Sequence, residues 1–142
     1  HIGSAAAGDE GVLEHTKVCE AVKYVNETGI SALAIMVGTA HGRYKRAPEL
    51  NIQRIKEIKE AANAYLVLHG GSGVPDEQIK AAIAAGIRKI NFGTDLCYSF
   101  LDKVFETSRD KIAIDVFMKE PIENVKKFAA EKIKLLGAEN RV

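Results

Sequence analysis

The segment LVLHGGSGVPDE, residues 66–77, contains a short apolar run, a histidine, a glycine-rich loop and the expected start of a helix. Pro75 suits the first turn of a helix because its missing N–H would have no partner there, and the acidic residues after it favour the positive end of a helix. The glycines allow a sharp turn and a close approach of backbone N–H groups to a ligand. A loop of this kind at a helix N-terminus predicts a phosphate site, with His69 as a metal-binding or acid–base group beside it.

Apolar runs of strand length alternate with helical patterns on both sides of this segment. Strands are expected at residues 30–37, 65–68 and 87–92. Helices are expected after Thr16 as a possible N-cap, from Asn51, from Pro75 to Gly86, after Thr94–Asp95 as caps, and from Pro121 to Gly137. Strands and helices that alternate with short loops predict parallel β-α units.

The chain is expected to form a single domain over residues 1–142. Its parts are a mobile loop at 1–14, β-α units at 15–106 and a C-terminal helical extension at 107–142. Three strands cannot close a barrel, since (β/α)8 barrels need at least about 200 residues. The sequence therefore forms a small open sheet or part of a larger barrel. The start at His1, without a methionine, favours the second alternative, with the missing strands upstream.

Composition excludes several classes of partner. The 142 residues carry 20 Lys+Arg against 19 Asp+Glu, a net charge of +1, so nothing indicates nucleic acid or a membrane surface as a partner. The longest apolar run, residues 30–37, is too short to span a bilayer. Two cysteines in expected helices fit a reducing compartment, and we predict a cytoplasmic location.

Three polar sequences follow the three expected strands: His41-Gly42, His69-Gly70-Gly71-Ser72 and Asn91-Phe92-Gly93-Thr94. Ligands of parallel α/β folds collect at these carboxyl ends, and imidazole suits zinc, which at catalytic sites commonly has three protein ligands. The residues alone leave alternatives open. Each histidine could be a hydrogen-bonded strand terminus, Asn91 and Thr94 could be helix caps, and Lys45 could be a solvated charge.

Three motifs in order resemble the class II ketose-bisphosphate aldolases, which include fructose- and tagatose-bisphosphate aldolases. They are GTAHGxYK at 38–45, LVLHGGSG at 66–73 and KINxxTD at 89–95. The resemblance covers essentially the whole chain but only about the last half of the family's barrel. It implies an α/β fold that is a partial TIM (β/α)8 barrel, with roughly the last three β-α units plus a C-terminal helix.

The same resemblance implies the residues of the site. His41 and His69 would be two ligands of a catalytic zinc ion, Asn91 would orient the reacting end of the substrate, and Glu10 would be a proton donor on the mobile loop. Substrate binding is implied for Gly42, Lys45, Gly70, Gly71, Ser72, Asn91, Phe92, Gly93 and Thr94. The family's Asp general base and a further histidine ligand of zinc lie on an earlier strand and have no counterpart in this chain.

The implied activity is zinc-dependent aldol cleavage and condensation in glycolysis or related carbohydrate metabolism. A ketose 1,6-bisphosphate, fructose in preference to tagatose, would be interconverted with dihydroxyacetone phosphate and glyceraldehyde 3-phosphate, with zinc acting as a Lewis acid on the ketone. The chain alone is expected to be inactive without the missing N-terminal half of the barrel. Family members also imply a homo-oligomer, a dimer or tetramer. The alternatives are a non-catalytic phosphate-binding half-barrel or degenerate paralogue, and a metal-free phosphate-binding barrel enzyme.

Overall fold

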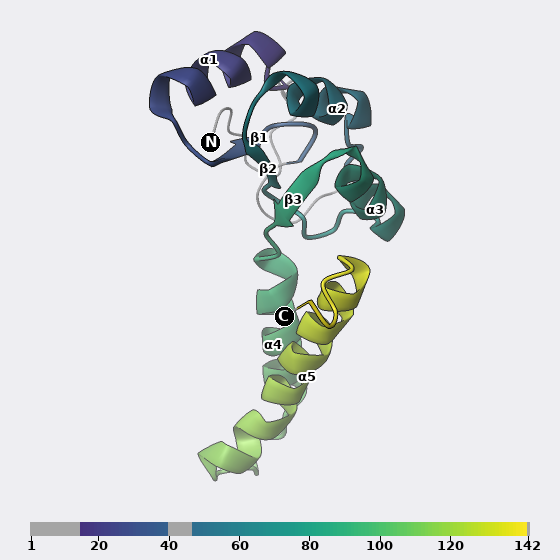
Figure 1. Ribbon diagram of the computed structural model, residues 1–142. Helices are drawn as coiled ribbons and strands as arrows, with labels where there is room; N and C mark the ends of the chain where they lie inside the picture. The colour runs from purple at the N-terminus through teal and green to yellow at the C-terminus, as the bar shows by residue number, and fades with distance from the viewer. Residues whose placement is uncertain (1–14, 40–46, 142) are drawn as a thin grey trace. The chain divides into compact units, whose positions relative to one another are not determined.

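The computed structural model describes residues 15–39 and 47–141 (Figure 1). The elements run α1 (Val18–Thr28), β1 (Ala32–Ile35), α2 (Ile52–Ala61), β2 (Tyr65–Leu68), α3 (Asp76–Ala85), β3 (Ile87–Ile90), α4 (Thr94–Glu106) and α5 (Ile114–Leu135). They form two compact units, with the boundary between Phe92 and Gly93. The first unit holds the sheet and the second holds α4 and α5, and we describe each by itself. The extent of a single domain over 1–142 stays a prediction.

The sheet of the first unit has three parallel strands in the order β1-β2-β3. Each strand is joined to the next by one helix, α2 or α3, and these two helices pack against each other. Because β-α-β connections are right-handed, strands added in one direction place both helices on the same face of the sheet. This order is the one that a segment of a (β/α)8 barrel has. The predicted parallel β-α units are confirmed.

The core of the first unit lies between the sheet and its helices. One face of the sheet and the inward faces of α2 and α3 contribute side chains that are 0–1% exposed: Leu33, Ile35, Leu66, Leu68, Ile87, Ile55, Ile58 and Ile79. The alternation of residues along each strand places Val67 on the opposite face, where no connecting helix lies. By the same alternation, the residues that follow β2 and β3 on this second face are His69 and Asn91.

The first strand is shorter than predicted because its ends have other partners. It covers Ala32–Ile35 instead of residues 30–37. Gly29 ends α1 in the left-handed conformation with φ 65°, as expected, so the chain is still turning before the strand begins. At the other end, the Met36 N–H donates to Thr16 Oγ1 at 2.8 Å and the Met36 carbonyl accepts from the Thr16 N–H at 2.9 Å. Thr16 therefore ends the sheet pairing, and the N-cap of α1 is Lys17 instead of Thr16.

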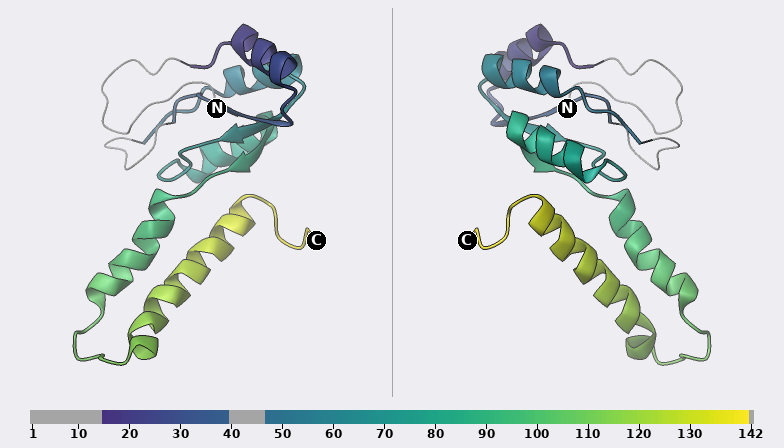
Figure 2. Two further views of the ribbon diagram at one scale, coloured as in Figure 1. Left: turned by 90° about the vertical axis from the view of Figure 1, so that its left-hand side faces the viewer. Right: turned by 90° about the vertical axis from the view of Figure 1, so that its right-hand side faces the viewer.

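The second unit is a pair of helices that pack side by side (Figure 2). Helix α5 begins at Ile114, so the predicted start at Pro121 is wrong, and Pro121 lies buried inside the helix. A proline suits the first turn of a helix because it has no N–H to donate, but here it is tolerated inside the helix. The first turn of α5 is closed by the hydrogen bond from the Phe117 N–H to the Ala113 carbonyl. The cap of α4 also differs from the prediction, because Gly93 is the N-cap and Thr94 is the first helical residue.

Candidate functional site at the carboxyl ends of the strands

The residues that follow the three strands are joined by hydrogen bonds. The Thr39 hydroxyl, buried after β1, donates to the His69 carbonyl at 2.7 Å after β2. The Asn91 N–H, after β3, donates to the Leu68 carbonyl at 3.1 Å. The Asn91 carbonyl then accepts from the Gly71 N–H at 3.0 Å. The structure therefore brings together strand ends that are up to 52 residues apart, as the parallel arrangement predicts.

The glycine loop packs so closely on the end of β3 that Gly71 has no room for a side chain. A Cβ at this position would lie 2.5 Å from Ile90 Cγ2 and 3.1 Å from both the Asn91 carbonyl oxygen and Phe92 Cε1. Gly70 and Gly73 adopt positive φ angles of 67° and 72°, which favour glycine. The loop leads into α3 through Pro75, which is the N-cap and not a first-turn residue. The predicted sharp turn before a helix N-terminus is confirmed.

His69 and Asn91 are neighbours across the β2–β3 pairing. The register pairs Leu68 with Ile90, so the next residue on each strand lies beside the other. His69 Nδ1 lies 3.1 Å from Asn91 Nδ2, and the Asn91 Oδ1 accepts from Lys89 Nζ at 2.5 Å. Asn91 could have been a helix cap on sequence grounds, but its side chain contacts His69 and the cap of α4 is Gly93.

Two further residues of the predicted site lie close to this cluster. Ser72, in the glycine loop, is buried with 5% of its surface exposed. Phe92 is half-buried and its ring edge lies against Gly71. Gly93 and Thr94 begin α4 and belong to the second unit. His41, Gly42, Lys45 and Glu10 lie outside the described residues, so the structure brings together His69, Gly70, Gly71, Ser72, Asn91 and Phe92.

The described part of the chain fits one ligand position of a zinc site. Within residues 15–39 and 47–141, no group of three or more His, Cys, Asp or Glu side chains could hold a metal ion. His69 nevertheless stands at the strand end with Nδ1 facing a donor, Asn91 Nδ2, and such a nitrogen carries the lone pair that a metal ligand needs. A catalytic zinc site takes three protein ligands, and the others would come from elsewhere.

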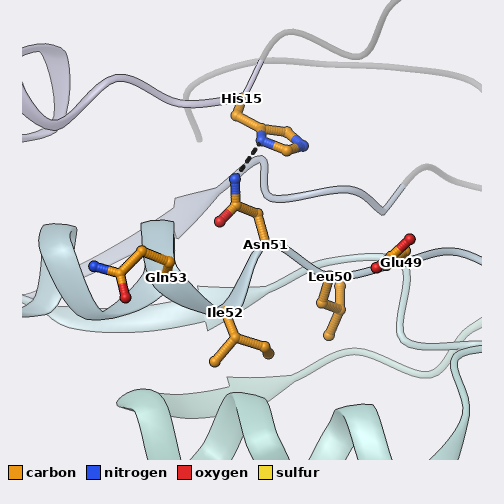
Figure 3. Close-up of a pocket in the computed structure, with 6 residues that line it drawn as sticks. All are labelled: His15, Glu49, Leu50, Asn51, Ile52 and Gln53. Atoms are coloured by element: carbon orange, nitrogen blue, oxygen red, sulfur yellow. Dashed lines mark hydrogen bonds between the residues drawn. The ribbon is translucent and has the colours of Figure 1, made fainter.

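A second histidine, His15, lines an open pocket that sequence reasoning did not find. The pocket has a volume of about 470 Å³ and is lined by His15, Glu49, Leu50, Asn51, Ile52 and Gln53 (Figure 3). His15 Nδ1 lies 3.0 Å from Asn51 Nδ2, while Asn51 Oδ1 caps α2 by accepting from the Arg54 N–H at 2.9 Å. His15 belongs to none of the sequence motifs, so the sequence did not indicate its position.

Parallel β-α units with a glycine loop and polar residues at their carboxyl ends define an α/β protein, a class in which ligands usually bind at that edge. The comparisons with known proteins give the family. The family model described as class-II fructose-bisphosphate aldolase matches residues 1–141, and this chain belongs to that family.

Two comparisons with YdjI and one with a structure of the same fold accompany the family match. The chain is 36% identical over 143 residues to the protein YdjI of Escherichia coli K12, covering 99% of this chain and 51% of that protein. The crystal structure of the E. coli K12 YdjI aldolase matches with a TM-score of 0.83 and 38% identity, over 90% of this chain and 48% of that one. The fructose-bisphosphate aldolase of Campylobacter jejuni, 21% identical, shares the fold with a TM-score of 0.73, over 95% and 50% of the two chains.

The chain thus spans about half the length of the relatives that it matches. Within the described residues, no helix is long and apolar enough to cross a membrane. The cytoplasmic location stays a prediction.

Proposed function

We propose that this chain supplies the phosphate loop and two zinc ligands of a class II aldolase. The reaction is the reversible cleavage of fructose 1,6-bisphosphate, in preference to tagatose 1,6-bisphosphate, to dihydroxyacetone phosphate and glyceraldehyde 3-phosphate. A second half-barrel would supply the general base and the remaining zinc ligand, since the chain spans half the length of its relatives. We further propose a cytoplasmic homo-oligomer as the assembled form.

The observation that carries the proposal is the hydrogen-bonded cluster of Thr39, His69, Gly71 and Asn91 at one edge of the sheet. It sets an imidazole, an amide and a glycine loop beside one another. The loop comes immediately before the N-terminus of α3, where the positive end of the helix dipole favours a phosphate. A metal-binding group next to an anion site is the combination that a phosphorylated ketone requires.

The residues divide into three roles. His69, with His41, would hold zinc, which when bound supplies Lewis-acid polarisation of the substrate ketone. The loop Gly70-Gly71-Ser72 would bind the phosphate through the Ser72 hydroxyl and main-chain N–H groups other than that of Gly71, which donates to the Asn91 carbonyl. Gly42, Lys45, Phe92, Gly93 and Thr94 would complete the site. Asn91 would hold the reacting end of the substrate, because its amide already contacts the ligand histidine. Glu10 would donate the proton to the leaving group.

The test measures aldol cleavage by the chain combined with a half-barrel corresponding to the part of YdjI outside the match. We expect activity on fructose 1,6-bisphosphate that is lost on chelation and restored by zinc. His69→Ala should lower kcat/KM at least about 100-fold and prevent the restoration, because it removes a metal ligand. The matched control is His15→Ala, which removes the other described imidazole and should leave kcat/KM within about twofold.

The remaining outcomes are equally informative. The chain without a partner half should show no measurable cleavage, because the general base is not in it. Activity that survives chelation would exclude zinc and favour a metal-free phosphate-binding enzyme. Inorganic phosphate binding to the combined protein with no cleavage under any metal condition would make the chain a non-catalytic half-barrel or degenerate paralogue.

A further inference from the structure

We infer that Lys89 is a positioning residue for the site, acting through Asn91 on the tautomer of His69. Lys89 belongs to β3 and its side chain is exposed, as is usual for a charged residue that alternates along a strand. In the structure its ammonium donates to Asn91 Oδ1, and Asn91 Nδ2 in turn faces His69 Nδ1. The three side chains form one continuous chain of contacts.

The strand register explains why these residues meet. Lys89 pairs with Val67 and Ile90 pairs with Leu68, so Asn91 follows beside His69. Lys89 and Asn91 are two residues apart, and side chains at this spacing lie on the same face of a strand. The Asn91 backbone is held at both its N–H and its carbonyl, by Leu68 and Gly71. Asn91 therefore has a fixed backbone position, and its remaining freedom is the orientation of its amide.

Lys89 decides that orientation because the two ends of an amide are not equivalent. An ammonium group only donates hydrogen bonds, so it pairs with the Asn91 oxygen and leaves the NH₂ group toward the ring. A rotated amide would set its NH₂ group against the ammonium, with two donors in contact. The orientation with Oδ1 toward Lys89 is the one in the structure.

The orientation of Asn91 then determines which nitrogen of His69 carries the proton. A ring nitrogen that receives an N–H must present its lone pair, so a neutral His69 holds its proton on Nε2 and its lone pair on Nδ1. The use of this tautomer rests on the proposed function. A zinc ion would bind the lone pair on Nδ1 in place of the Asn91 contact. The tautomer itself is defined by residues of this chain.

The test records long-range ¹H–¹⁵N correlation spectra of the histidine rings of the metal-free chain at one fixed pH where the rings are neutral. His69→Gln identifies the signals of His69. We expect the Nε2–H tautomer in the unmodified chain and, in Lys89→Met, a fall of at least about fivefold in the ratio of the two tautomers. Lys89→Arg should restore the ratio, because a guanidinium is also a donor only. Lys80→Met, which removes an exposed lysine bound to Glu77, is the matched control and should change nothing.

Asn91→Asp gives a second test, in which the opposite tautomer of His69 is expected. A carboxylate presents an oxygen to the ring, so His69 should change to the Nδ1–H tautomer. An unchanged tautomer ratio in Lys89→Met, or an Nδ1–H tautomer in the unmodified chain, would overturn the inference. If the chain by itself gives no dispersed spectrum, the same spectra are recorded on the metal-free protein combined with its half-barrel.

The outcome is distinguishable from that of the proposed function. Activity that resists chelation would exclude the zinc role and leave the tautomer result in place. In the combined protein, Lys89→Met should lower kcat with Lys89→Arg restoring it, while KM changes by less than about twofold, because Lys89 acts through another residue. A tautomer ratio that does not respond to Lys89 would remove this role and leave the aldolase proposal standing.

Discussion

The two units of the chain differ in how they bury apolar side chains. In the first unit, the strands and helices share a core in which eight large residues are 0–1% exposed. In the second unit, the described residues 93–141 contain only Thr107 and Pro121 as buried positions, although α4 and α5 pack along each other. Every described residue of the hydrogen-bonded cluster lies in the first unit. The candidate site therefore lies in the unit that has a buried core of its own.

The second unit instead exposes large apolar side chains. Phe105 is 79% exposed at the end of α4, Ile112 is 94% exposed in the connection, and Ile114 is 79% exposed at the start of α5. Large exposed apolar groups that cluster in sequence are uncommon on a surface that contacts only water. Substitutions of these residues should lower the free energy of unfolding of the isolated chain only slightly. An experiment can therefore compare them with substitutions of buried residues in the first unit.

The largest expected effect comes from cutting the core of the first unit. Ile55→Ala should lower the free energy of unfolding by about 2–5 kcal/mol, because Ile55 is fully buried and the change leaves a cavity. The matched change in the second unit, Phe105→Ala, should stay within about 0.5 kcal/mol because its ring is already in water. Urea unfolding followed by circular dichroism measures both. Equal losses would contradict the contrast between the units.

A smaller effect is expected from adding one methyl group to the glycine loop. Gly71→Ala should cost about 1–3 kcal/mol, because its Cβ would overlap Ile90 and the Asn91 carbonyl. Gly93→Ala is the control in the second unit. A Cβ at this position would have no atom within 4 Å, so the change should cost no more than about 1 kcal/mol, the order expected when alanine replaces glycine as an N-cap. Thermal unfolding measures stability, and amide exchange at residues 69–73 measures the loop. A tolerated Gly71→Ala would show that the loop is not packed as described.

The smallest effect concerns an exposed ion pair of the second unit. Lys111 donates to Glu120 at 3.0 Å and lowers the pKa of that carboxyl below its ordinary 4.5. A lowered folded-state pKa contributes stability above pH 4.5 that is lost as the pH falls through the folded-state value. Lys111→Met should return the titration midpoint of Glu120 toward 4.5, measured by the ¹³C shift of its carboxyl. The pair Lys80–Glu77 of the first unit, in which Glu77 raises the pKa of Lys80, should be unaffected.

Local patterns predicted much of the first unit. Continuous apolar runs indicated β1 and β2, and Gly29, Asn51 and Gly86 indicated helix ends that the structure has. One error came from a contact distant in sequence and one from a local turn. Thr16 was read as a cap but instead bonds Met36, 20 residues away, and so shortens β1. Pro121 was read as a helix start, whereas the turn before it also forms a helix.

The candidate site was predictable in part for the same reason. The carboxyl ends of parallel strands must share one edge, so His69 and Asn91 were expected near each other, and the structure has them in contact. Lys89 stands in the KINxxTD motif, but a charged residue that alternates along a strand usually faces water, so the sequence indicates no role for it. Its role depends on the β2–β3 register, which no local pattern reports. His41 and Glu10 lie outside the described residues, and their roles stay predictions.

In the described sheet, β2 lies between β1 and β3, and each of these outer strands pairs on one side only. Two copies joined edge to edge would therefore contribute six described strands, whereas a (β/α)8 barrel closes with eight and a fixed stagger. The described strands of two copies therefore do not add up to a closed barrel. Under the proposed function, the outer edges of β1 and β3 are where a complementary half-barrel would pair, so a homo-oligomer would have to form through surfaces away from these edges.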